Sequence, residues 1–348
     1  MSLASALATG DVAELPNRRQ EDWRWTDLRG ALRALPPASP AGEAAAIGSG
    51  PFDGLTSDQI VFLNGRAQSE TVIAVAEAAA RTAALRWVSQ TSNTAHGGKV
   101  RIVVAAGARL VLLESYEGRG EAYVADAVLE FELGEGASVE RVVLAEDAAD
   151  AISVSTATVA LAPHARFAQT VLTSGAKRQR LETQVSHPGG GGELRLDGGY
   201  LIGGARHADL TTVVAHQGLD GRTEQLTKGA VAGAARGVFQ GRIVVAEGAD
   251  HTDARMGHHA LILSDRAEVD AKPELEIYAD DVACAHGNTV GALDEDALFY
   301  IRSRGVPEHE ARALLTQAFV GEVVDRIEHE GARDAARAWV ASHLEALA

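Results

Sequence analysis

Small residues recur at a nearly constant spacing along the middle of the chain, and each is followed by a strand-like run rich in Val, Leu, Ile and Thr. Corners of this kind suit stacked coils, because only small side chains fit where the backbone turns. The spacing therefore predicts a β-solenoid over residues 99–290, and it leaves open whether one period is one coil or two. The corners, at separations of 29, 28, 27, 29 and 28 residues, are Gly107-Ala108, Gly136-Ala137, His164-Ala165, Gly191-Gly192, Asp220-Gly221 and Gly248-Ala249. The competing interpretation is a large antiparallel sandwich with glycine-rich turns.

Residues 1–98 are predicted to form a helical arm, a linker and a short hairpin. Trp23 and Trp25 lie in a charged segment, and we expect them to pin the arm onto the body of the protein, with a binding face as the alternative. The proline-rich stretch 36–54 predicts the linker. Asn64-Gly65 predicts a tight hairpin, because both residues tolerate a positive φ. The alanine-rich stretch 71–87 favours a helix.

The last part of the chain, residues 291–348, is predicted to be a helical domain. Acidic residues open ALDEDALFYIRSRG, arginines follow and Gly305 ends it, as helix-capping rules require. Pro307 opens a second predicted helix with one apolar stripe, and ARDAARAWVASHLEALA predicts a third.

Composition excludes several classes of protein. The 348 residues are 46% apolar, which is ample for a buried core, and the formal charge of −16 argues against binding nucleic acid or an anionic membrane through a basic surface. The N-terminus lacks the features of a secretory signal, and no run is apolar enough to span a bilayer. The single cysteine favours a cytoplasmic location. There is no Walker loop, GxSxG elbow or HExxH helix, and we interpret the glycines at 189–192 as a flexible corner.

The stretch YADDVACAHGNTVG holds the best candidate site. Cys284 and His286 are two residues apart, so on a strand they share a face, and thiol and imidazole are metal-binding groups. A buried cysteine that acts as a small apolar residue is the alternative.

A second candidate site lies in EGADHTDARMGHH. Asp250, His251, Asp253, His258 and His259 could supply metal ligands, and His251 and Asp253 would share a strand face. His258 and His259 would point to opposite sides. A surface loop with no bound ion is the alternative.

The run LILSDRAEVDAKPELEIYADDVACAHGNTVGALDEDALFYIRSRGV, residues 261–306, resembles the SufB/SufD family of iron–sulfur cluster assembly scaffolds. The segments PNRRQEDWRWTDL and ARALLTQAFVGEVVDRI resemble the same family, and the lack of SufB-type cysteine patterns favours the SufD branch. The resemblance implies a right-handed parallel β-helix core between helical domains. It also implies that Cys284 and His286, with His286 the stronger candidate, support iron or a nascent cluster at an interface with a SufB-like paralogue.

Further expectations come from the same resemblance. The chain would pair with the SufB-like subunit through its β core, or with itself when alone, and would hold no cofactor stably. Iron or an iron–sulfur cluster would be shared transiently with SufB, and ATP would be bound by a SufC-like ABC ATPase. That ATPase would dock on the C-terminal helices through Leu298, Phe299, Tyr300, Arg302, Arg304, Leu314 and Phe319.

The expected function is therefore that of a scaffold subunit without enzymatic activity. The alternative from another class is a β-solenoid carbohydrate lyase or hydrolase with acidic and histidine side chains along a groove. The scarcity of aromatic residues, 5% of the chain, counts against it. A plain structural adaptor with Cys284 in its core is a third possibility.

Overall fold

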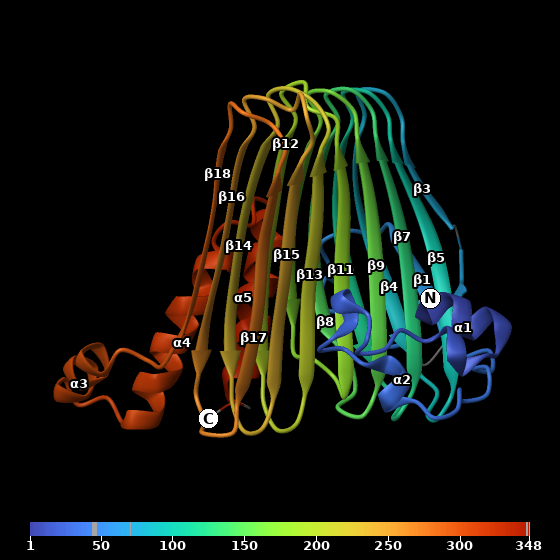
Figure 1. The fold of residues 1–348 in the computed structure, drawn as a ribbon. Helices are drawn as coiled ribbons and strands as arrows, with labels where there is room; N and C mark the ends of the chain where they lie inside the picture. Colours follow the sequence, from blue (N-terminus) through green and yellow to red (C-terminus); the bar gives the residue numbers. More distant parts are fainter. Residues whose placement is uncertain (44–46, 70, 346, 348) are drawn as a thin grey trace.

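The computed structural model describes residues 1–43, 47–69, 71–345 and 347. From Gln59 to Gly291 the chain winds into a parallel β-solenoid of about eight turns, as predicted (Figure 1). One sequence period is one coil, because Arg109 pairs with Ser138, which pairs with Arg166 on the next coil. Each full coil contributes one strand to each of two sheets.

The strands of the described residues form a 10-stranded and an 8-stranded sheet. All pairs are parallel except β1 and β2, which form the predicted hairpin around Asn64-Gly65. The larger sheet consists of β1 (Gln59–Leu63), β2 (Arg66–Ala67), β4 (Ala80–Ser89), β6 (Arg109–Gly118), β8 (Ser138–Glu146), β10 (Arg166–Thr173), β12 (Glu193–Ile202), β14 (Arg222–Val231), β16 (Asp253–Ile262) and β18 (Ala283–Gly291). The smaller sheet consists of β3 (Val72–Val75), β5 (Ala95–Val104), β7 (Val124–Leu133), β9 (Ile152–Leu161), β11 (Arg178–His187), β13 (His207–His216), β15 (Arg236–Val245) and β17 (Glu268–Ile277).

The recurring small residues mark one column of corners. Two residues before a strand of the larger sheet, the backbone turns through a left-handed conformation with φ between 54° and 70°. Glycine adopts this conformation without strain, and Asp, Asn and His tolerate it better than other residues. The predicted corner Gly248-Ala249 lies outside the column, because its place is taken by His251, which follows Asp220 by 31 residues. The column consists of Ala78, Gly107, Gly136, His164, Gly191, Asp220 and His251.

The space between the sheets is filled mainly by apolar side chains, including Phe131, Phe167 and Phe239. Some of the buried polar groups there are paired. Glu114, with no exposed surface, accepts hydrogen bonds from Arg141 at 2.7 Å and from the Tyr116 hydroxyl at 2.6 Å. This pairing offsets the desolvation cost of a buried carboxylate.

The expected helix over residues 71–87 is wrong, because this stretch forms β3 and most of β4. Alanine favours a helix in isolation, but tertiary pairing overrides that preference. Leu85 and Trp87 enter the core, and β4 is held in register between β1 and β6. Stacked strands therefore begin at Gln59, inside the region expected to precede the core.

The N-terminal arm lies against the smaller sheet. It contains α1 (Leu3–Thr9), η1 (Val12–Glu14), η2 (Glu21–Trp23) and α2 (Leu28–Ala31). The Arg180 guanidinium lies 4.3 Å from the centre of the Trp23 ring and donates to the Asp22 carbonyl at 2.6 Å. Trp23 thus pins the arm, as predicted.

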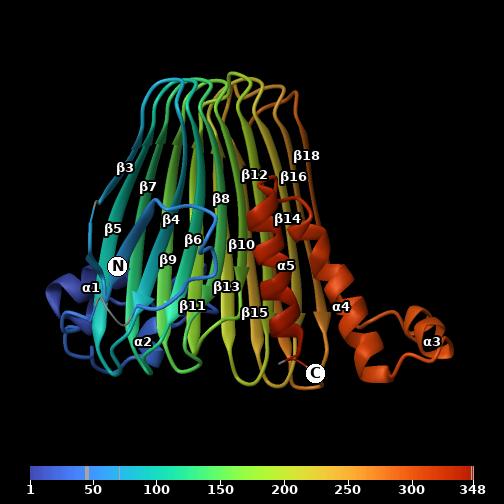
Figure 2. The ribbon, with the colours of Figure 1, turned by 180° about the vertical axis from the view of Figure 1, so that it is seen from behind.

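The C-terminal helices are α3 (Glu295–Ser303), α4 (Glu308–Val324) and α5 (Glu330–Glu345), and all three were predicted from the sequence. α4 and α5 cover part of the outer face of the larger sheet, and α3 projects from the body (Figure 2). No helix of the described residues is long and apolar enough to cross a membrane.

Candidate functional site at the open end of the solenoid

The solenoid ends in two strands that each lack one neighbour. β17 is the last strand of the smaller sheet and β18 the last strand of the larger one, so within the described residues each pairs on one side only (Figure 1). A strand of this kind presents a row of unpaired backbone N–H and C=O groups. We call β17 and β18 together the open end.

Apolar side chains are exposed at the open end. Ile277 is 41% exposed and Val290 is 42% exposed. They are in register with Val245 and Ala260, which are buried in the core, so they belong to the same inward-facing rows. The interior of the solenoid is therefore uncovered at this end.

Cys284 and His286 lie on the same inward-facing side of β18, as strand alternation predicts. Cys284 is in register with Ala254 and His286 with Met256, and both of those partners are buried. Cys284 is half-buried against the core, whereas His286 is exposed. Burial raises the pKa of the Cys284 thiol, and the nearby Asp253 carboxylate raises it further. The thiol form is thus favoured at neutral pH, and Cys284 is not an activated nucleophile in the isolated chain.

Cys284 and His286 do not form a complete metal site in the described residues. No group of three or more His, Cys, Asp and Glu side chains there could hold a metal ion. Thiol and imidazole are suitable ligands for iron, but a protein normally supplies more than two. Any site at the open end would need ligands from elsewhere.

The second candidate site is not assembled as predicted. The His251 ring contacts Asp220 at 3.1 Å and Asp281 at 3.4 Å, at the corner column, while Asp253 pairs with Arg255 at 3.1 Å. The expectation that His251 and Asp253 share a strand face is wrong, because residue 251 lies in a left-handed turn and not on a strand. His251 and Asp253 therefore do not act as a unit.

His258 and His259 point to opposite faces, as predicted. His259 lies on the outer side and its Nδ1 contacts the Thr289 hydroxyl at 2.7 Å. His258 is fully buried, and both of its ring nitrogens are hydrogen-bonded, one to Tyr200 and one to Asn288. Sequence reasoning missed Asn288. The available signal was its position two residues after His286, on the same side of the strand.

The candidate docking residues on the helices divide by exposure. Phe299 is 74% exposed and Tyr300 is 59% exposed, and Leu314 is also exposed. Leu298 is buried, and Phe319 is partly buried against the core under α4 and α5. These last two side chains hold the helices in place and leave little surface for a partner.

The arginines of this region have partners within the helices. Arg302 pairs with Glu308 at 3.3 Å, and the Arg304 guanidinium lies 4.8 Å from the centre of the Tyr300 ring. Both pairs lie beside the exposed rings of α3, so this surface combines aromatic and cationic groups.

Comparison with known proteins identifies the family. A family model described as the SufBD core domain of the SUF system for FeS cluster assembly matches residues 65–319. This match covers more than half of the 348 residues. The chain belongs to the SufBD family. The matched range includes Cys284, His286 and all of α3.

The chain is also similar to individual proteins. The chain is 29% identical to the iron-sulfur cluster assembly protein SufD of Escherichia coli over 98% of this chain and 91% of that protein. It is 32% identical to a SufBD family protein of Synechocystis, over 66% of this chain and 52% of that protein. It is 28% identical to Protein ABCI7, chloroplastic, of Arabidopsis thaliana over 72% of this chain and 52% of that protein.

Membership of the SufBD family makes the chain a component of iron–sulfur cluster assembly by the SUF system and confirms the predicted family. In the described residues the exposed aromatic side chains are Tyr278, Phe299 and Tyr300, which lie after β17 and on α3.

Proposed function

We propose that this chain is a scaffold subunit without enzymatic activity, and that it pairs with a SufB-type paralogue through the open end. The unpaired edges of β17 and β18, beside the exposed side chains of Ile277 and Val290, are the observation that carries this proposal. A partner that adds a strand to each edge would satisfy the backbone groups and cover the apolar rows.

Cys284 and His286 would face that partner across the interface. Iron or a nascent cluster would be cargo at this position, with His286 as a ligand and Cys284 as a weaker candidate. The partner would supply the remaining ligands, since this chain has a single cysteine and the half-buried thiol is not activated.

The exposed surface of α3 and α4 would bind a SufC-type ATPase. Support comes from Phe299 and Tyr300, which are exposed on the projecting helix α3, and from Leu314, which is exposed on α4. ATP would be bound and hydrolysed by that partner, because this chain has no phosphate-binding loop.

The pairing is tested with a double variant of the open end, Ile277→Lys with Val290→Lys. The two lysine ammonium groups would be buried without a partner in the proposed interface, which is costly. They should therefore lower the affinity for the SufB-type paralogue of the same organism by at least about a hundredfold. The matched control is Val72→Lys with Leu219→Lys, which charges two equally exposed apolar positions, one of them on β3 at the opposite end. Equal affinity of the two double variants would refute the pairing.

The cargo site is tested with His286→Ala in the assembled complex. The variant should still join its partners, because His286 is exposed, but the complex should retain less iron after anaerobic purification. His259→Ala, on the outer face of the neighbouring strand, is the control. Full iron content and full cluster delivery by the His286→Ala complex would remove His286 from the site.

A further inference from the structure

A buried hydrogen-bonded chain runs from the interior of the solenoid to the open end. The Tyr200 hydroxyl lies 2.8 Å from His258 Nε2, and His258 Nδ1 lies 2.7 Å from Asn288 Oδ1. Tyr200 and His258 have no exposed surface, whereas Asn288 on β18 is exposed. The chain therefore connects two buried side chains to one that faces a potential partner.

The hydrogen-bond directions in this chain follow from burial. Among the described residues the Tyr200 hydroxyl has a single hydrogen-bond partner, His258 Nε2. A buried hydroxyl without an acceptor is costly, so the hydroxyl donates and Nε2 accepts. His258 Nδ1 then carries the proton and donates to Asn288 Oδ1. The Asn288 amide N–H groups are left pointing away from His258.

Packing holds the chain in place. A Cβ at Gly229 or Gly237 would lie within 2.1 Å or 2.5 Å of the Tyr200 ring, so both positions require glycine. The His258 ring is stacked on Phe239, with centroids 4.7 Å apart and an angle of 2° between the planes. The carboxamide of Asn288 is thus oriented before any partner arrives, which reduces the entropy lost on binding.

Asn288 belongs to the inward-facing row of β18. It lies two residues beyond His286 and is in register with His258, just as His286 is in register with Met256. A strand added beside β18 would place its own inward-facing side chains next to this row. No acceptor for the two amide N–H groups is present among the described residues, so a partner would have to supply one.

We infer that Asn288 determines partner specificity, because it presents an oriented amide donor that requires an oxygen acceptor in the same row of the incoming strand. The acceptor is a carboxylate, carboxamide or hydroxyl oxygen. A partner with an apolar side chain at that place would leave the buried amide without an acceptor. Binding of such a partner would therefore be disfavoured. This inference rests on the proposed pairing through the open end.

The test is Asn288→Asp, measured as affinity for the SufB-type paralogue. The substitution preserves shape and the acceptor for His258 Nδ1, but it replaces the outward donor with an oxygen. We expect the affinity to fall about ten- to a hundredfold, as for an unsatisfied polar pair. Asn93→Asp, which makes the same change of charge near the other end of the solenoid, should have no effect.

The outcomes separate this inference from the proposed pairing. If Asn288→Asp binds as tightly as the parent while Ile277→Lys with Val290→Lys abolishes binding, the inference fails and the pairing stands. If neither variant affects binding, both fail.

Nitrogen NMR of the free chain tests the orientation independently of any partner. His258 should carry its proton on Nδ1, where it donates to Asn288 Oδ1. A His258 protonated on Nε2 in the parent protein would overturn the assignment of Asn288 as an outward donor.

Discussion

Asp126 shows at the scale of single residues how burial sets chemistry in this protein. It lies on β7 with 7% of its surface exposed, next to a small internal cavity that is also lined by His96 and Ser89. Among the described residues its carboxylate has no hydrogen-bond or ion-pair partner. Burial raises the pKa of Asp126 from 3.8 to about 7, since the charged form is poorly solvated there.

The raised pKa of Asp126 predicts that its contribution to the free energy of unfolding depends on pH. A carboxyl group whose pKa is higher in the folded state stabilises the fold below pH 3.8, and that contribution is lost as the pH rises through about 7. The variant Asp126→Asn has no charge to bury at this position, so it should exceed the parent in unfolding free energy by about 2–4 kcal/mol at pH 8. The difference should vanish near pH 4, as measured by urea denaturation across this range.

Buried histidines also make stability depend on pH, and they do so equally in the parent and in the Asp126→Asn variant. Burial lowers the pKa of His96 to about 4 and that of His216 to about 3, so both the parent and the variant should lose stability as the pH falls below 6.5. Only the difference between the two proteins reports on Asp126. A difference that is the same at pH 4 and pH 8 would contradict the assignment.

The sequence predicts the shared face of Cys284 and His286, because strand alternation is local. It does not reveal that Asn288 is tied to His258, since that contact joins residues 30 apart through the register of β16 and β18. Nor does it reveal that His251 sits in a turn. Contacts of this kind depend on the residue at which each coil begins. Extra residues between two coils shift that residue along the sequence.

At the scale of elements, α3 differs from the other C-terminal helices. Its buried side chain is Leu298, while Phe299 and Tyr300 are exposed to solvent. An exposed pair of aromatic rings on a projecting helix is typical of a binding surface.

The variant Phe299→Ser with Tyr300→Ala tests this surface. We expect it to weaken binding of the SufC-type ATPase by more than about tenfold without lowering thermal stability, because the two rings are exposed. Leu298→Ala should instead cost about 2–5 kcal/mol of stability, as a buried leucine does. Isothermal titration with the ATPase and thermal denaturation distinguish the two effects, and unchanged binding by the double variant would exclude α3 as the docking element.

Most elements are predictable because their signals are local. Asp294 caps α3 by accepting from the backbone N–H groups of Asp296 and Ala297, and Gly305 follows with a φ of +90°. The alanine-rich stretch 71–87 has no such signal for a strand. Its conformation is decided by β1 and β6 on either side, which a local pattern does not include.

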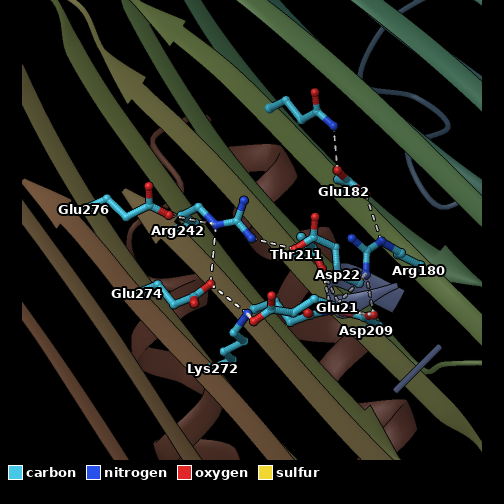
Figure 3. A network of polar contacts seen from close by, with 12 residues as sticks. Glu21, Asp22, Arg180, Glu182, Asp209, Thr211, Arg242, Lys272, Glu274 and Glu276 are labelled. Carbon is cyan, nitrogen blue, oxygen red and sulfur yellow. Dashed lines mark hydrogen bonds and ion pairs between the residues drawn. The ribbon is translucent and has the colours of Figure 1, made fainter. Parts of the chain in front are cut away.

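At the scale of the whole molecule, the two ends of the solenoid differ. The larger sheet ends on one side in the hairpin β1–β2 and on the other in the open end. The N-terminal arm reaches toward the open end, where Glu21 pairs with Lys272 on β17 at 2.7 Å and Asp22 pairs with Arg242 on β15 at 2.6 Å (Figure 3). These ion pairs tie the start of the chain to its last coils.

The two ends of the solenoid are therefore not equivalent. The candidate cargo residues, the oriented amide of Asn288 and the exposed apolar rows all lie at the same end.

Hydrogen exchange of this chain, with and without the SufB-type paralogue, tests the central claim most directly. Pairing through the open end predicts that the backbone amides of β17 and β18 exchange more slowly in the complex, while those of β9, in the middle of the solenoid, are unchanged. A stable complex in which β17 and β18 exchange as fast as in the free chain, with protection appearing elsewhere, would contradict the claim.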